Sequence, residues 1–101
     1  MRQLPRTAPA ACQSMAELRA EIDSLDAELF ERFAERMTYI HRAAELKRGA
    51  GIPANVPERV DEVVANARAR AASHGLDPEL YGDFWQQLVA AAIAEEERLG
   101  V

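Results

Sequence analysis

The chain is 101 residues long, which is enough for one small domain, and it carries a formal net charge of −5 at pH 7. This acidic balance argues against nucleic acid or an anionic membrane surface as the main partner. With a single cysteine, Cys12, the chain cannot form an internal disulfide, and a reducing cytoplasm is the expected compartment.

Residues 1–13 are predicted to form a flexible N-terminus ahead of one helical domain over residues 14–101. They contain two arginines, two prolines and no long apolar run, so they lack the continuous apolar stretch of a secretory signal. No segment of the chain approaches the ~18 apolar residues of a membrane span. We therefore expect no association with a membrane.

A long first helix is predicted from Met15 to Arg48. Ser14 and Glu17 have the spacing of a capping box, and no proline or glycine interrupts the segment before Gly49. Such a helix would be roughly 51 Å long, whereas a compact chain of this length is only about 33 Å across. Because nothing in the segment would kink the helix, we expect it to extend across a partner subunit.

One face of this helix combines apolar residues with two cations. The apolar side chains recur at helical spacing: Leu18, Ile22, Leu25, Leu29, Phe33, Ile40 and Ala43. The same face passes through Arg36 and Lys47, which lie eleven residues apart. Buried charge is costly unless it is paired, and no acid on this stripe pairs them. We predict that an anionic ligand binds there; the alternative is that both side chains snorkel to solvent from the edge of the face.

Arg19 is a third candidate, but it precedes Arg36 by about 25 Å along the helix axis. It cannot join the same site within its own chain. An antiparallel partner helix could bring a second copy of Arg19 to that site, which would make the site shared between two chains.

Two further helices follow a loop rich in glycine and proline. The second helix is predicted to begin near Asn55 or Val56 and to end before Gly75, a favourable C-terminal cap. The third is predicted to be capped by Asp77 and to run to about Leu99. With no strand pattern, the sequence predicts an all-α fold of three helices.

An acid continues the apolar stripe of the third helix. The stripe consists of Tyr81, Trp85, Leu88, Val89 and Ala92, which are expected in the core. It then reaches Glu96, whereas the neighbouring Glu95 and Glu97 are interpreted as a solvated acidic end. An acid at a core position, together with Arg36 and Lys47, weakens the interpretation that these charges are merely solvated.

Other site chemistries lack support in the sequence. His41 and His74 lie far apart, and no His or Cys pair has metal-ligand spacing, so no metal site is expected. There is no glycine-rich phosphate loop and no recognisable Ser-His-acid set, and we expect no cofactor.

The stretch from Leu18 to Lys47, LRAEIDSLDAELFERFAERMTYIHRAAELK, resembles the first helix of the all-α (type II) chorismate mutases. That family carries L-R-x-x-I-D-x-L-D, then A-E-R, then a lysine eleven residues after the arginine. The segments IPA…PERV (Ile52–Val60) and GLD (Gly75–Asp77) also fit, so the resemblance covers about residues 14–99. Within the family, R-M-x-Y at Arg36–Tyr39 and the IPA…PERV segment are most similar to the isochorismate-pyruvate lyases.

The resemblance implies an intertwined helical homodimer with two equivalent sites. It assigns Arg36 and Lys47 to the site of their own chain and Arg19 to the site of the partner. It assigns to Glu58 a hydrogen bond with a substrate hydroxyl, and it puts Glu96 where most of the family has glutamine. Two departures concern substrate recognition: the family's serine near the third-helix site is Ala92, and a helix-two arginine of some members is Pro57.

The implied activity is the pericyclic rearrangement of chorismate, a small dicarboxylate, to prephenate on the shikimate pathway to aromatic amino acids. Arg19 and Arg36 would hold the two carboxylates. Lys47 and a protonated Glu96 would stabilise the charge that grows on the ether oxygen. The same pocket could cleave isochorismate to salicylate and pyruvate or accept an amino-chorismate. A non-catalytic helical dimer with a regulatory role is the alternative from another functional class.

Overall fold

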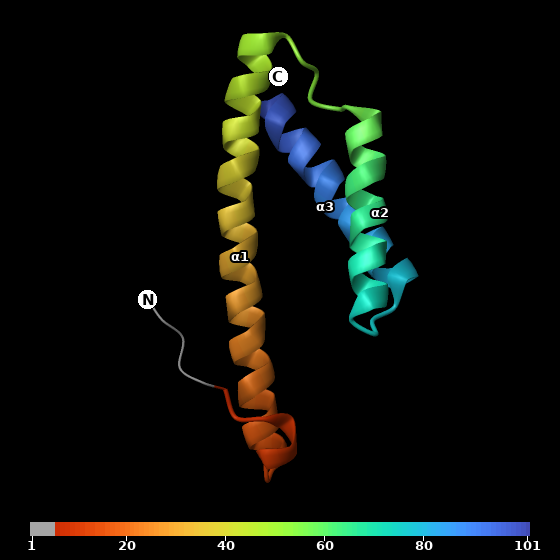
Figure 1. The fold of residues 1–101 in the computed structure, drawn as a ribbon. Coiled ribbons are helices and arrows are strands. Elements are labelled where there is room, and N and C mark those ends of the chain that lie inside the picture. Colours follow the sequence, from red (N-terminus) through yellow and green to blue (C-terminus); the bar gives the residue numbers. More distant parts are fainter. Residues whose placement is uncertain (1–5) are drawn as a thin grey trace. The chain divides into compact units, whose positions relative to one another are not determined.

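The computed structural model describes residues 6–101. This part contains a short 3-10 turn at Pro9–Ala11 and three helices, α1 at Met15–Ala50, α2 at Pro57–Ser73 and α3 at Pro78–Arg98 (Figure 1). No strand occurs among these residues, so the predicted all-α fold is confirmed. None of these helices is long and apolar enough to cross a membrane. The chain divides into two compact units, and the boundary between them falls within α1, after Arg36.

The helix ends follow the predicted capping signals. Ser14 Oγ accepts a hydrogen bond from the Glu17 N–H at 3.1 Å, although the Glu17 carboxylate bonds the N–H of Gln13, at 2.9 Å, rather than that of Ser14. Helix α1 ends two residues later than predicted because Gly51, with φ of 68°, is the residue that turns the chain into the left-handed conformation.

Helices α2 and α3 also begin and end close to the predicted positions. Gly75 adopts φ of 71°, and the N–H of Leu76 donates to the Ala71 carbonyl at 2.8 Å, which closes α2 with a Schellman motif. The Asp77 carboxylate then accepts from the N–H of Glu79 at 3.0 Å and caps α3.

The first unit consists of the N-terminal segment and the first 22 residues of α1. The Arg6 guanidinium pairs with the carboxylate of Glu28 and donates to Ser24 Oγ at 3.1 Å, and the N–H of Thr7 donates to Glu21 at 3.1 Å. These contacts attach the segment to a polar face of α1. The flexibility expected of residues 1–13 stays a prediction, and residues 1–5 lie outside the described part.

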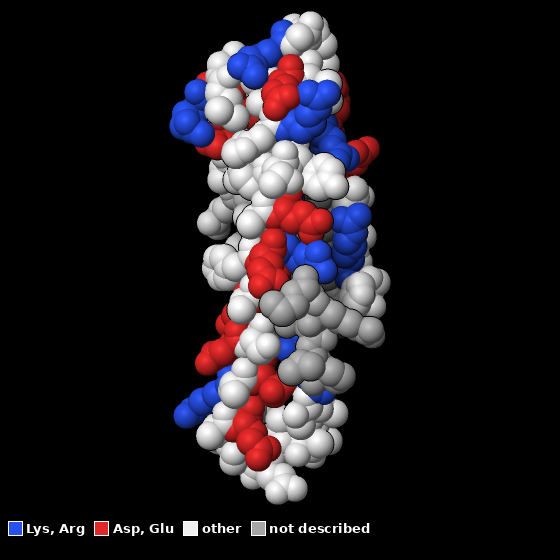
Figure 2. All heavy atoms as spheres, turned by 90° about the vertical axis from the view of Figure 1, so that its left-hand side faces the viewer, with Lys and Arg blue, Asp and Glu red and all other residues white. Residues whose placement is uncertain are grey.

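The apolar stripe of α1 is only partly covered within the single chain, and its burial against a partner subunit stays a prediction. Ile22, Leu25 and Leu29 are 48%, 43% and 52% exposed, and Leu18 and Phe33 are half-buried. Figure 2 shows acidic and basic side chains interspersed on the face turned to the viewer.

The core of the second unit lies mainly between α2 and α3 and is built from small side chains. The buried residues of these two helices are Val64, Ala67, Ala71, Gly82, Val89, Ala92 and Glu96. Ala44 of α1 is fully buried as well. Tyr81 and Trp85, which were predicted in the core, are half-buried, and Trp85 makes an edge-to-face contact with Phe84 at 5.8 Å between ring centroids.

Candidate active site

An ion pair between the half-buried Lys47 and the buried Glu96 joins α1 to α3 in the second unit. Glu96 is only 3% exposed and is the one charged or polar residue classed as buried in the described part of the chain. Its Oε1 accepts a hydrogen bond from Lys47 Nζ at 2.6 Å. No acid on α1 pairs this lysine, as the sequence indicated, but α3 supplies one. Helical periodicity therefore located both charged side chains correctly but could not show that they meet.

The loop between α1 and α2 holds the same ammonium group from another side. Lys47 Nζ donates to the backbone carbonyl of Ala54 at 2.9 Å, and Ala54 is itself buried. An ammonium group has three N–H donors, and two of them are directed at Glu96 and Ala54. The third can be offered to a ligand. Lys47 is thus a cation whose position is fixed before any ligand arrives, which is the condition for electrostatic stabilisation of a transition state.

The remaining site residues predicted from sequence are less fully placed. Arg19 is exposed and Arg36 is half-buried, and both belong to the first unit. Their approach to Lys47 and Glu96 therefore stays a prediction. Glu58 is exposed in the first turn of α2, where its negative charge favours the helix N-terminus.

The two departures from the family pattern occupy defined positions. Ala92 is buried one turn before Glu96 on α3, so a methyl group stands where a hydroxyl would offer a hydrogen bond. Pro57 is the first residue of α2, where its missing N–H costs no helical hydrogen bond. Alanine and proline thus suit these two helix positions, but neither side chain can form a hydrogen bond with a polar substrate group.

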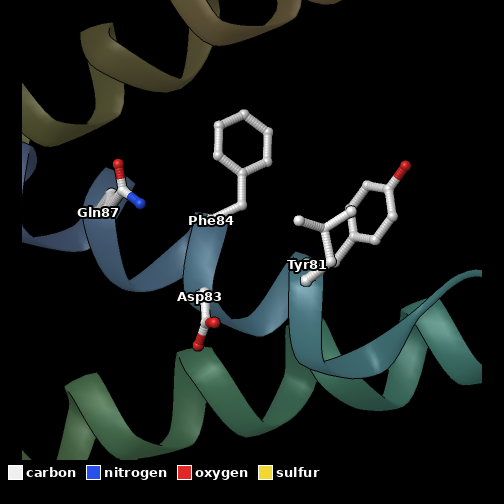
Figure 3. Close-up of a pocket in the computed structure, with 5 residues that line it drawn as sticks. Tyr81, Asp83, Phe84 and Gln87 are labelled. Atoms are coloured by element: carbon white, nitrogen blue, oxygen red, sulfur yellow. The ribbon is translucent and has the colours of Figure 1, made fainter.

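Two surface pockets in the second unit differ in how well their lining residues suit an anion. One, of about 560 Å³, is lined by Lys47, Arg48, Gly51–Pro53, Gly100 and Val101 and therefore has two cations at its wall. The other, of about 320 Å³, lies on α3 beside Tyr81, Asp83, Phe84 and Gln87 (Figure 3). Its only charged lining residue is the acidic Asp83, so it does not suit a dicarboxylate.

Sequence reasoning missed a second link between α1 and α3. His41 Nε2 lies 2.7 Å from Glu95 Oε2, and Arg98 donates to both Glu95 oxygens at 2.7 and 2.9 Å. The hydrogen bonds from Arg98 and then from His41 lower the pKa of Glu95 to about 2. Glu95 was interpreted as part of a solvated acidic end, but its side chain is only 21% exposed. The available signal was its position next to the stripe residue Glu96.

The described residues contain no group of three or more His, Cys, Asp or Glu side chains that could hold a metal ion.

Comparison with known proteins points to one family. The family model described as chorismate mutase type II matches residues 18–97. The T-protein of Haemophilus influenzae is 31% identical over 88 residues, which are 87% of this chain but only 23% of that protein. The chain thus spans about a quarter of the length of this relative.

Two shorter relatives match over most of their own length. The 4-amino-4-deoxychorismate mutase of Streptomyces pristinaespiralis is 33% identical over 92% of this chain and 73% of its own length. The isochorismate pyruvate lyase of Pseudomonas aeruginosa is 32% identical over 87% of this chain and 86% of its own length.

Proposed function

Because the chain belongs to the chorismate mutase type II family, we propose that it rearranges chorismate to prephenate in a homodimer with two shared active sites. The observation that carries this proposal is the ion pair between the half-buried Lys47 and the buried Glu96. The rearrangement is intramolecular and pericyclic, so it needs neither a nucleophile nor a metal. It needs a bound, compact substrate conformer and donors at the ether oxygen, where negative charge grows as the C–O bond breaks.

Lys47 is suited to the ether oxygen because its ammonium group is fixed by two acceptors and has a third N–H to offer. Fixed donors avoid the reorganisation that water would need at that moment. Glu96 can assist when it is protonated: one carboxyl oxygen accepts from Lys47, as in the structure, and the other donates to the substrate.

Arginine side chains would hold the two substrate carboxylates. Arg36 of the same chain and Arg19 of the partner are proposed for this task because a guanidinium binds a carboxylate through two parallel hydrogen bonds. Glu58 is proposed to accept from the substrate hydroxyl. This set positions the substrate rather than reacting with it, and positioning alone can supply several kcal/mol of barrier reduction, roughly 7 in favourable cases.

The exposed apolar stripe of α1 supports the dimer. Ile22, Leu25 and Leu29 are about half exposed, and Leu80 and Phe84 of α3 are 60% and 44% exposed. A second copy that covers these side chains would bury apolar surface at a gain of about 25 cal/mol per Å². Cys12, which is free, supports a reducing cytoplasm as the compartment.

We predict that the protein is a dimer in solution. Light scattering or sedimentation at micromolar concentration should give a mass of about twice 11.2 kDa. Charged substitutions of Leu25 or Leu29 should lower that mass, because a charge on the stripe cannot be buried against a second copy. A stable monomer that turns over chorismate at full rate would exclude both the dimer and the shared site.

Assays with alternative substrates test the reaction itself. We expect purified protein to convert chorismate to prephenate, followed through loss of chorismate absorbance. Isochorismate should be assayed separately, because R-M-x-Y at Arg36–Tyr39 and the isochorismate pyruvate lyase relative favour cleavage to salicylate and pyruvate as a second activity. An amino-chorismate substrate should also be included. Lack of turnover with all three would favour a non-catalytic helical dimer.

We predict that Glu96→Gln flattens the pH dependence of kcat/KM. In the wild type, kcat/KM should fall as pH rises, because an ionised Glu96 offers no proton to the ether oxygen and repels the dianionic substrate. Glutamine has similar size, can accept from Lys47 through its carbonyl and keeps a donor at every pH. The measurement is kcat/KM from about pH 5 to pH 9 for both proteins. An unchanged profile, or loss of activity at every pH, would show that Glu96 has another role.

A further inference from the structure

We propose that His41 and Glu95 form a positioning pair that fixes the register of α1 against α3 and so holds Lys47 and Glu96 in their working geometry. The inference rests on the proposed mutase activity, but it concerns residues that the proposed chemistry does not use. Neither His41 nor Glu95 is assigned any contact with substrate.

The argument starts from two neighbouring carboxylates on α3. Glu95 reaches His41 at 2.7 Å, and Glu96 reaches Lys47 at 2.6 Å. His41 and Lys47 are six residues apart on α1, or about 9 Å along the helix axis. The end of α3 is therefore attached to α1 at two separated points.

Ala44 lies midway between these two points on α1 and is fully buried. With only one link, α3 could rotate about the remaining pair or slide along α1 past the small alanine side chain. Two links on either side of Ala44 restrict both motions. The second link thus supports the geometry of the first, although it lies outside the reacting groups.

Arg98 makes Glu95 a constant acceptor. Its guanidinium donates to both Glu95 oxygens, which fixes the plane of the carboxylate and leaves Oε2 directed at His41. The pKa of Glu95, lowered to about 2 by Arg98 first and His41 second, keeps this group ionised throughout the neutral range. The experiments therefore replace the donor, His41, and leave Glu95 unchanged.

The pair is poorly suited to a purely structural role. The His41 side chain is 46% exposed, and ion pairs at exposed positions contribute little to stability. Its removal should leave the fold intact. By contrast, a small displacement of a catalytic donor can cost a large factor in rate. Loss of His41 should therefore affect turnover much more than stability.

Arg42 provides a matched control. It is the next residue on the same helix and also pairs with a glutamate, but its partner Glu45 lies on α1 at i+3, so the contact does not reach α3. We expect His41→Ala to lower kcat for chorismate about tenfold with KM changed less than about threefold, since the arginines proposed to bind the carboxylates are untouched. We expect Arg42→Ala to keep both constants.

Two conservative variants distinguish the effect of losing the hydrogen bond to Glu95 from the effect of losing the imidazole ring. Glutamine places its amide nitrogen near the position of the imidazole Nε2, which bonds Glu95, whereas asparagine reaches only as far as Nδ1. His41→Gln should therefore recover most of kcat, and His41→Asn should behave like His41→Ala. Thermal unfolding of all four variants verifies that each is folded.

A readout without turnover keeps the inference testable whatever the substrate is. Looser pairing with Glu96 should expose the Lys47 amine, so acylation of Lys47 by acetic anhydride, followed by peptide mass spectrometry, should be faster in His41→Ala and His41→Asn. It should be unchanged in Arg42→Ala and His41→Gln. Wild-type protein inactive on chorismate would overturn the proposed function alone. Equal Lys47 acylation in His41→Ala and Arg42→Ala would overturn the positioning role.

Discussion

Replacing Lys47 by methionine is expected to lower kcat/KM for chorismate by about 10²- to 10³-fold, the usual cost of removing one preorganised donor to a developing oxyanion. Methionine keeps an unbranched side chain as far as the Cε position but removes the charged nitrogen with all three N–H groups. The loss should fall mainly on kcat, because the proposed contact strengthens as the C–O bond breaks. Steady-state assays over a range of chorismate concentrations measure it.

A second effect must be separated from this loss. Lys47→Met leaves the buried Glu96 carboxylate without its partner, which should cost up to about 3 kcal/mol of unfolding free energy. The control is the double variant Lys47→Met with Glu96→Met, which removes both charges. We expect it to recover stability in denaturant unfolding but not activity. Recovery of activity in the double variant would mean that Lys47 serves the fold and not the reaction.

The helices of this chain could be predicted from local signals. Ser14 caps α1, Gly75 ends α2 and Asp77 starts α3, and each acts through hydrogen bonds to residues at most a few positions away. The small discrepancy at the end of α1 has the same local origin, since Gly51 rather than Gly49 adopts the left-handed conformation. Such signals are contained within short windows of sequence.

The site could be predicted only in part, because its contacts join residues far apart in the chain. Periodicity identified Lys47 and Glu96 as charges on apolar stripes, but their pairing depends on how α3 crosses α1. The same crossing brings Glu95 to His41, and the only local sign of this contact was the position of Glu95 next to Glu96. The stripe of α1 shows the converse: its pattern predicts burial, but Ile22, Leu25 and Leu29 remain about half exposed in the described part of the chain.

Mixing two inactive variants is expected to restore activity if the site is shared between chains. Arg19→Ala and Lys47→Ala should each lose most activity, about 10²-fold or more, since each removes a charged group proposed to bind substrate or transition state. In a heterodimer of the two, one site has both residues intact and the other lacks both. Random subunit exchange at equal concentrations should make half of the dimers heterodimers, so about a quarter of all sites should be active.

The geometry also supplies a matched negative control. Arg36 and Lys47 are proposed to serve the site of their own chain, so a heterodimer of Arg36→Ala with Lys47→Ala has one defect in each site. That mixture should stay inactive, although it exchanges subunits equally well, as native mass spectrometry of isotope-labelled chains can establish. Recovery in this control would contradict the placement of Arg36 and Lys47 in the site of one chain. No recovery with Arg19→Ala, despite proven exchange, would contradict the assignment of Arg19 to the partner's site. The contrast between the two mixtures isolates the one arginine that has to cross the interface, because all three variants remove a single cation from the same long helix.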